Sequence, residues 1–318
     1  MRKYLVQFDA KEVCMDYKRL IKSRKVRLFI LKLLNFVPDK LMLKLQYRIK
    51  FGRKLDLRSP KRFTEKLQWY KLYYKNPLLV QCVDKYDVRK YVEEKGLTNI
   101  LNECYGVYEN VNDINFDILP HSFVIKDTLG GGGNSVIIVT DKNTLDRNET
   151  VDRLKEWLKP ASAMKGGGRE WPYYSGEENR IVIEKYIQPE EGSLDDYKFF
   201  CFDGRVECLY VMKDRKLGES VKVGIFNRNF EKLKVLRAGD EDIGNNIEKP
   251  KYFERMVEIA EQLSADFPHV RVDLYNVDGN IVFGELTFYG ASGYMKFDPD
   301  TFDYELGEKF NLKVHKEV

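Results

Sequence analysis

Arg271-Val-Asp273-Leu-Tyr-Asn-Val-Asp278-Gly279-Asn-Ile-Val-Phe-Gly-Glu285-Leu-Thr287 is the stretch that decides the fold. Apolar residues alternate with Arg271 and Asp273, which predicts a half-buried strand. Asp278-Gly279 is a strong hairpin-turn signal, and the residues after it are expected to form the returning strand. Asp273 and Glu285, if they point the same way, would offer hard oxygen ligands for Mg²⁺. Arg271 beside them could hold a phosphate oxygen. An ordinary hairpin with exposed charges is the alternative.

A glycine-rich loop lies upstream of this hairpin. Ser122-Phe-Val-Ile-Lys126 predicts a short strand that ends in a lysine, and residues 136–140 predict a second strand. Between them, Gly130-Gly-Gly-Gly133 would let backbone N–H groups approach an anion without obstruction by Cβ atoms. A strand follows and no Gly-Lys-Ser/Thr does, so neither a P-loop nor the dinucleotide fingerprint fits. We predict a flap between two strands with Lys126 at its base; a flexible linker is the alternative.

In chain order, several segments resemble the ATP-grasp superfamily. They are Asp84-Lys85, Lys126 with its flap, Ile181-Val-Ile-Glu184-Lys185-Tyr186-Ile187, Arg271-x-Asp273 and Glu285-x-Thr287. A second set resembles, more narrowly, the TupA-like ATP-grasp family: Tyr47-Arg-Ile-Lys-Phe-Gly52, Ser59-Pro-Lys-Arg-Phe-Thr-Glu65-Lys66-Leu, Leu119-Pro-x-Ser-Phe-Val-Ile-Lys126, Arg169-Glu-Trp171, Asp196-Tyr-Lys198-Phe-Phe-Cys-Phe-Asp-Gly204 and Gly284-Glu-Leu-Thr287. The ordered set covers most of the chain.

The resemblance implies an α+β ATP-grasp fold, in which two subdomains clasp ATP, with a basic helical region before it. The boundaries that we expect are 1–75 for the basic region, 76–118 for a helical segment, 119–189 for the subdomain with the flap, and 190–318 for the subdomain with the metal site.

The resemblance also implies a site for ATP and Mg²⁺. It assigns the phosphates to Lys85, Lys126, Gly131, Gly132, Gly133 and Asn134. It assigns the adenine to the link of Glu184, Lys185 and Ile187, and the ribose to Glu191, with Glu190 as its rival. It assigns the metal to Asp273, Glu285 and Thr287. A threonine hydroxyl binds Mg²⁺ more weakly than the asparagine that many relatives carry there.

The reaction that the resemblance implies is amide formation through an acyl phosphate. Lys198 would hold the terminal phosphate or the acceptor carboxylate, and Arg271 with the N–H groups near Ser292-Gly293 would stabilise the oxyanion. The substrates would be a carboxylate and an amine. The TupA-like resemblance implies a role in cell-surface polymer or capsule biosynthesis, such as joining amino acids to uronic acids or building an acidic peptide.

Two other function classes stay open. A glycosyltransferase would use a D-x-D metal motif, and Asp298-Pro-Asp300 and Asp240-Glu-Asp242 both match one loosely. Such matches are frequent in a chain with 33% charged residues, and neither follows an apolar strand. A nucleotide-binding scaffold without catalysis is the other alternative, against which the intact Lys126, Arg271, Asp273 and Glu285 argue.

The composition fits a soluble enzyme. The chain has 318 residues, 43% of them hydrophobic, which is enough for about two domains with a sizeable core. Its five scattered cysteines form no CxxC pair, so we expect free thiols in a reducing cytoplasm and no structural zinc. The first residues are charged throughout and the apolar runs fall short of the ~20 residues of a membrane span, so we expect neither a signal peptide nor a transmembrane helix.

The charge is concentrated near the N-terminus. Residues 1–75 carry 22 Lys and Arg but 6 Asp and Glu, a net charge of +16, whereas the remainder carries −12. This basic, partly apolar region favours a cytoplasmic protein that touches an anionic membrane surface from the inner side. A helix packed on the catalytic core is the alternative. The acidic remainder and the lack of a recognition motif argue against nucleic acid as a partner.

Overall fold

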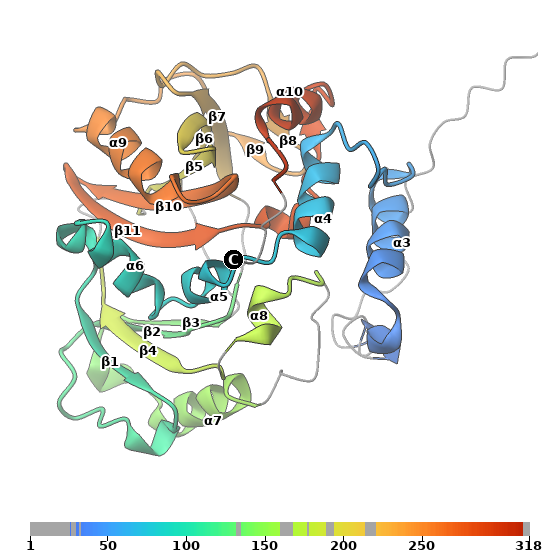
Figure 1. Ribbon diagram of the computed structural model, residues 1–318. Coiled ribbons are helices and arrows are strands. Elements are labelled where there is room, and N and C mark those ends of the chain that lie inside the picture. The colour runs from blue at the N-terminus through green and yellow to red at the C-terminus, as the bar shows by residue number, and fades with distance from the viewer. Residues whose placement is uncertain are drawn as a thin grey trace, which may run out of the picture.

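The computed structural model describes residues 26, 30–31, 33–131, 135–159, 168–176, 178–188, 194–213 and 221–313. Two sheets dominate the fold, and Figure 1 shows helices α5 and α6 between them. The mixture of helices with mainly antiparallel sheets agrees with the predicted α+β class. The boundaries expected at residues 76, 119 and 190 stay a prediction.

The four-stranded sheet has the order β1-β4-β2-β3. Its strands are β1 (Cys104–Tyr108), β2 (Phe123–Asp127), β3 (Val136–Val139) and β4 (Ile181–Lys185). One face is apolar: Phe123, Ile125 and Ile183 pack with Leu154 of α7 (Arg147–Trp157). Because strand side chains alternate, the neighbouring residues Lys126 and Glu184 face away from α7, toward the other sheet. The strands predicted on either side of the glycine loop are confirmed.

The six-stranded sheet has the order β11-β10-β5-β6-β7-β9. Its strands are β5 (Asp196–Phe202), β6 (Arg205–Lys213), β7 (Lys222–Asn227), β9 (Glu241–Asp242), β10 (His269–Val277) and β11 (Asn280–Thr287). Helix α9 (Phe253–Ser264) covers one face.

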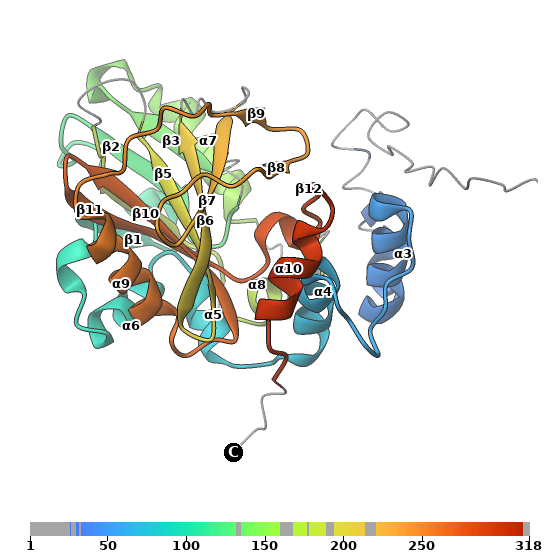
Figure 2. The ribbon, with the colours of Figure 1, turned by 90° about the horizontal axis from the view of Figure 1, so that it is seen from above.

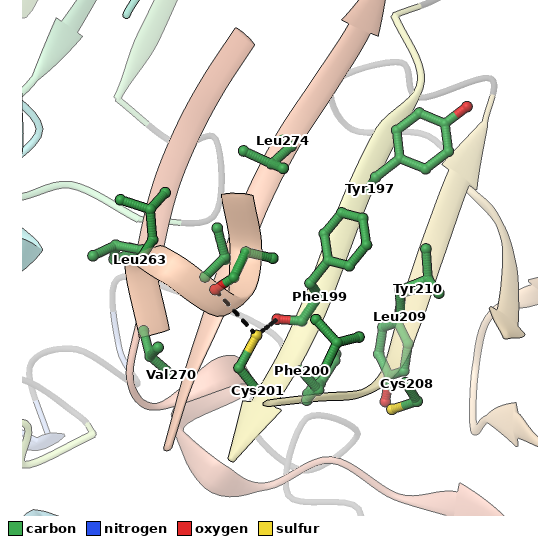
Figure 3. Packing of buried hydrophobic residues seen from close by; sticks show 14 of the residues in the cluster. Tyr197, Phe199, Phe200, Cys201, Cys208, Leu209, Tyr210, Leu263, Val270 and Leu274 are labelled. Carbon is green, nitrogen blue, oxygen red and sulfur yellow. Dashed lines mark hydrogen bonds between the residues drawn. The ribbon is translucent and has the colours of Figure 1, made fainter. Parts of the chain in front are cut away.

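Figure 3 shows the apolar packing between β5 and α9. Phe199 packs its ring 6.1 Å from that of Phe253, and the Cys201 thiol donates to the carbonyl of Ala260 on α9. The odd-numbered residues of β5 therefore face α9, and Lys198 faces the opposite side of the sheet, as its sequence neighbours predicted. Burial raises the pKa of Cys201 to about 12, so this thiol stays protonated at neutral pH.

The hairpin of β10 and β11 forms as predicted. Asp278 and Gly279 have φ values of 49° and 92°, the two left-handed positions that a tight turn of this kind needs. The register pairs Asp273 with Glu285 and shifts by one residue between Asp273 and Leu274, a β-bulge that leaves Gly284 without a partner across the strands.

The N-terminal helices have different surroundings. In α4 (Phe63–Tyr73), Phe63 packs on Phe202 and Phe310 and belongs to the core of the six-stranded sheet. In contrast, α3 (Asp39–Phe51) lies at the edge of the molecule in both Figure 1 and Figure 2. None of the helices in the described ranges is long and apolar enough to cross a membrane.

The sequence predicts a helix from about Asp84 to Glu94; this helix is present, but its start was misplaced by four residues. Helix α5 (Leu78–Val83) ends at Asp84, and α6 begins only at Val88. Asp84 Oδ1 accepts the N–H groups of Tyr86 and Asp87 at 2.8 and 3.0 Å. The Asp84 carbonyl also accepts from Val88 N–H at 3.1 Å, so Asp84 caps the turn that leads into α6.

Short elements complete the described fold. They are η1 (Leu34–Phe36), α6 (Val88–Glu94), η2 (Thr98–Ile100), η3 (Val111–Asp113), η4 (Lys142–Thr144), α8 (Pro172–Ser175), β8 (Leu236–Arg237), η5 (Gly290–Gly293), β12 (Phe297–Asp298) and α10 (Phe302–Lys309). Of the five cysteines, Cys82, Cys104, Cys201 and Cys208 lie in the described ranges and are free thiols, and Cys14 lies outside them.

Candidate functional site

Three charged side chains form a row across the six-stranded sheet. Asp273 on β10 is paired with Lys198 on β5 and with Glu285 on β11. Residues that face each other directly on neighbouring strands point to the same side of a sheet, so the three groups meet on the face opposite α9. Lys198 Nζ contacts Asp273 Oδ2 and lies 2.6 Å from Asp196 Oδ2. The predicted same-side arrangement of Asp273 and Glu285 is thus present.

Arg271 ties this row together. Its Nε and Nη2 donate to the two carboxylate oxygens of Asp273, both at 2.6 Å. Nη2 also donates to Glu285 Oε1 at 3.1 Å and to Thr287 Oγ1 at 3.0 Å. Burial disfavours the charged guanidinium, but Asp273 and Glu285 outweigh it and raise the pKa of Arg271 above its ordinary value. Arg271 is therefore a permanent cation fixed among oxygen atoms.

The two acids differ in exposure. The side chain of Asp273 is 2% exposed, whereas that of Glu285 is 42% exposed. Burial raises the pKa of Asp273, while Arg271 and Lys198 oppose that rise. For Glu285 desolvation also acts upward, but Arg271, Lys198 and Lys85 prevail and lower its pKa to about 2. Glu285 is thus an ionised carboxylate that solvent or a ligand can reach.

A second lysine–carboxylate pair lies on the inner face of the four-stranded sheet. Lys126 Nζ donates to Glu184 Oε2 at 2.7 Å. Arg89 Nη1 lies 3.7 Å from the other oxygen of Glu184. Lys126 is paired across the strands with Val182, so the contact with Glu184 runs diagonally between β2 and β4.

Lys85 contacts the glycine loop of the four-stranded sheet and is influenced by the charge of Glu285 on the other sheet. Its Nζ contacts the carbonyl of Gly130 in the glycine loop and donates to that of Thr128 at 3.3 Å. Burial lowers the pKa of Lys85, the charge of Glu285 opposes this, and the charge of Lys126 adds to it. Lys85 therefore lies within electrostatic reach of acids and bases from both sheets, which makes one cationic region between them.

The adenine side of the predicted site is less complete. Lys185 donates its N–H to the carbonyl of Glu103 at 2.9 Å, and its own carbonyl accepts from Asn102 at 2.8 Å. The edge of an adenine base would have to share the N–H and carbonyl groups of Lys185 with these partners. Ile187 follows the end of β4 and is partly buried, and Gly131 is exposed. Gly132, Gly133, Asn134, Glu190 and Glu191 lie outside the described residues.

The donor set of Asp273, Glu285 and Thr287 fits Mg²⁺ only together with a ligand. Within the described ranges, no three or more His, Cys, Asp or Glu side chains gather as a metal site. Two carboxylates and one hydroxyl leave the other positions of an octahedral ion to phosphate oxygens and water, which is how Mg²⁺ usually accompanies a nucleotide.

A polar cluster beside Arg271 was missed by the sequence interpretation. Lys71 of α4 has a fully buried side chain, and its Nζ donates to the carbonyls of Gly168 and Ser292 at 2.8 and 2.7 Å. Burial lowers the pKa of Lys71 to about 8, and Glu170, 3.8 Å away, opposes that shift. A Cβ atom on Gly290 would lie 3.3 Å from Arg271 Nη1, so η5 passes directly over the guanidinium.

The signal that could have identified Lys71 is its position on the apolar side of α4, four residues after the buried Leu67 and one after the buried Tyr70. Tyr173 of α8 was missed as well. It lies within electrostatic reach of Glu285 and Arg271, and burial raises its pKa.

The D-x-D acids engage nearby basic residues. Asp240 Oδ2 accepts from Arg237 at 2.5 Å, and Asp242 contacts Lys232. Asp300 Oδ2 lies 2.7 Å from Arg62 and 3.1 Å from Arg53. These acids serve surface ion pairs, and no observation favours a sugar-nucleotide site around them.

Comparisons with known proteins agree with the motifs. The family model described as TupA-like ATPgrasp matches residues 65–311. A search of curated proteins returns no match. Solved structures with a similar arrangement include the D-alanine–D-alanine ligase of Bacillus anthracis complexed with ATP, at 21% identity and a TM-score of 0.40 over 65% of this chain and 55% of that one.

Two further structures are comparable. The D-alanine–D-alanine ligase of Helicobacter pylori has 16% identity and a TM-score of 0.42 over 78% of this chain and 68% of that one. The L-amino acid ligase of Bacillus licheniformis has 16% identity and a TM-score of 0.41 over 81% of this chain and 55% of that one. The chain spans little more than half the length of the Bacillus anthracis ligase. At these scores the structures carry no argument about activity, and the assignment rests on the family match.

Proposed function

The chain belongs to the TupA-like ATP-grasp family, and from this premise we propose that it is an ATP-dependent ligase that joins a carboxylate to an amine. The observation that carries the proposal is the row of Lys198, Asp273 and Glu285 with Arg271 bonded across it. Cations and ionised acids on rigid neighbouring strands are what phosphoryl transfer requires, because its catalysis is mainly positioning and charge neutralisation.

The triphosphate of ATP would lie between the two sheets. Lys126 would exchange Glu184 for a phosphate oxygen, and Lys85 would approach the phosphates from the turn after α5. Lys198 would meet the terminal phosphate or the acceptor carboxylate. Mg²⁺, held by Asp273, Glu285 and Thr287, would neutralise charge on the β and γ phosphates. The support is the shared electrostatic environment of Lys85, Lys126 and Glu285.

The reaction has two steps. A carboxylate oxygen of the acceptor attacks the γ-phosphorus, the bond from that phosphorus to ADP breaks, and an acyl phosphate forms. The nitrogen of the amine then attacks the acyl carbon, and phosphate leaves with the electrons of the C–O bond while the amine loses a proton. Arg271, with its guanidinium against Gly290, is suitably charged to stabilise the oxyanion of the second step.

We propose an acidic acceptor for this reaction, namely a uronic acid or the carboxylate of an acidic peptide in a cell-surface or capsule polymer. The support is the family assignment together with the cations that surround the acids of the site. Amino acids are the proposed amines.

The test is ADP release with Mg²⁺, screened over uronic acids and amino acids in pairs. We expect release that depends on both substrates and an amide product detectable by mass spectrometry. ATP with Mg²⁺ should also raise the thermal unfolding midpoint, because ligands that bind only the native state stabilise it. A UDP-sugar that stabilises the protein while ATP does not would instead indicate a glycosyltransferase.

A further inference from the structure

One helix face carries apolar side chains that no other part of the described chain covers. On α3, Leu41 and Leu45 are 58% and 51% exposed, while Met42 and Leu43 on the other side are buried. Leu33 and Phe36, in the turn that leads into the helix, are 57% and 83% exposed. A soluble surface scatters its exposed apolar residues, so four of them in one short segment indicate a contact surface.

A row of basic residues runs beside these leucines. Lys40, Lys44 and Arg48 follow at intervals of four, and all three are exposed; Lys40 directly precedes Leu41, and Lys44 directly precedes Leu45. Residues four apart lie on one side of a helix, so the basic row and the leucine pair form adjacent stripes. We call these five residues the outer face of α3. None of its three cations is paired with an acid in the described part of the chain.

The segment holds a single acid, and that acid is engaged. Between residues 33 and 54, Asp39 is the only Asp or Glu against six Lys and Arg. The Asp39 carboxylate accepts from Arg169 at 2.9 Å. The same guanidinium donates to the carbonyls of Leu34 and Val37 at 2.7 and 3.0 Å. Arg169, which is buried, therefore fixes the turn and the helix start to the segment that also carries Glu170.

We propose that the outer face of α3, with Leu33 and Phe36, docks on the surface of an anionic lipid membrane. Leucine and phenylalanine side chains would enter the headgroup boundary, and Lys40, Lys44 and Arg48 would meet lipid phosphates. An apolar stripe beside a basic stripe is the pattern of helices that lie in a membrane interface, where both terms add. The charge of this face favours a membrane over a second copy of the chain as its partner. Two copies that met through this face would bring six uncompensated cations together. This inference goes beyond the ligase activity and does not depend on it.

The experiment is co-sedimentation of the full chain with vesicles of phosphatidylglycerol and phosphatidylcholine. Leu41→Gln/Leu45→Gln removes the apolar stripe without changing charge, and we expect it to weaken partitioning by at least about tenfold. Lys40→Gln/Lys44→Gln/Arg48→Gln should weaken it at low salt and have little effect at high salt. The matched control is Ile118→Gln, since Ile118 is 76% exposed but belongs to the loop before β2. It should bind as the wild type does.

Three results would overturn the proposal. In the first, the wild-type protein does not bind anionic vesicles at low salt. In the second, the Leu41→Gln/Leu45→Gln variant binds vesicles as the Ile118→Gln control does. In the third, the wild type self-associates without binding vesicles, and the Leu41→Gln/Leu45→Gln variant no longer self-associates. The thermal unfolding midpoint and ADP release without vesicles should match the wild type in every variant. A failure of the ligase assay alone would leave the vesicle result interpretable.

Discussion

The two sheets each hold a lysine against a carboxylate, and the two pairs differ in how firmly they are fixed. Lys198 and Asp273 are directly opposed across strands, with side chains 11% and 2% exposed, and each has a further partner of opposite charge. Lys126 and Glu184 meet diagonally, with side chains 27% and 11% exposed, and Arg89 is the second cation near Glu184 among the described residues.

The difference suggests that the Lys198–Asp273 pair is a fixed part of the structure and that the Lys126–Glu184 pair can be exchanged for a ligand. A buried carboxylate with two cationic partners cannot lose one without leaving a charge unpaired in a low-dielectric interior. In the more accessible pair, Lys126 is 27% exposed, so the pair contributes less to stability and its carboxylate can be exchanged for another anion. We therefore expect Lys126 to exchange its carboxylate for phosphate readily, whereas Lys198 and Arg271 can leave Asp273 only where Mg²⁺ replaces their charge.

The largest expected effect is that of Asp273→Asn. The change leaves Arg271 and Lys198 without their shared anion, so we expect a loss of about 3 kcal/mol in the free energy of unfolding, measured in urea. ADP release should fall to background. If the variant is as stable as the wild type, the pair on the six-stranded sheet is no firmer than the other one.

Glu285→Gln should separate catalysis from stability. Glu285 is 42% exposed and contacts only one edge of Arg271, so the free energy of unfolding should change by less than about 1 kcal/mol. ADP release should fall by about a hundredfold or more, because charge on the phosphates is no longer neutralised. The control is Asp278→Asn at the exposed tip of the same hairpin. Equal ADP release from both variants would remove Glu285 from the metal site.

Lys71 tests what burial does to a lysine that has no carboxylate at bonding distance. Its pKa is about 8 in the folded state, below the ordinary ~10.4, so the unfolded state binds more protons between these values. The free energy of unfolding attributable to this group should therefore rise between pH 8 and pH 10, by up to about 3 kcal/mol, and be constant below pH 8. Urea titrations should show that rise in the wild type. In Lys71→Met it should be absent; an identical pH profile would mean that Lys71 is not buried in solution.

The smallest effect is expected for Lys126→Gln. Lys126 is 27% exposed and Arg89 remains near Glu184 as a second cation, so the free energy of unfolding should shift by about 0.5 kcal/mol or less. The KM for ATP should rise by about tenfold, since one charge-assisted contact to phosphate is lost. The matched variant Lys155→Gln removes an exposed lysine from α7, on the outer face of the same sheet, and should leave the KM unchanged. A large loss of stability in Lys126→Gln would erase the contrast between the two sheets.

Much of the site could be predicted because its residues follow local patterns. The alternation around Arg271 and Asp273 and the Asp278-Gly279 turn specify a hairpin, and the chain order of the motifs identifies the family and the ATP-grasp fold. The helix expected from Asp84 to Glu94 is present, but its regular part starts only at Val88, after a turn that the Asp84 carboxylate caps.

Contacts between distant segments could not be predicted. Lys71 reaches the carbonyl of Ser292, 221 positions away, and Arg169 reaches that of Val37, 132 positions away. No periodicity in either segment encodes the other. The outer face of α3 could likewise be predicted only as part of a basic, partly apolar region, because the partition of its leucines between core and surface depends on how the helix packs.

Gly284 determines which side of the sheet the residues after it face. The turn pairs Val277 with Asn280, and an uninterrupted ladder would then set Asp273 opposite Gly284 and Glu285 opposite Val272. Val272 faces α9, so Glu285 would point into the apolar layer. The bulge adds one residue and turns Glu285 to the side of Asp273. A Cβ atom at position 284 would lie 2.9 Å from the carbonyl oxygen of Asp273, so glycine is the residue that the insertion tolerates. The bulge thus absorbs one supernumerary residue without a side chain. A regular ladder that kept Gly284 would turn Glu285 inward, whereas deletion of Gly284 would remove the bulge and leave Glu285 directly opposite Asp273.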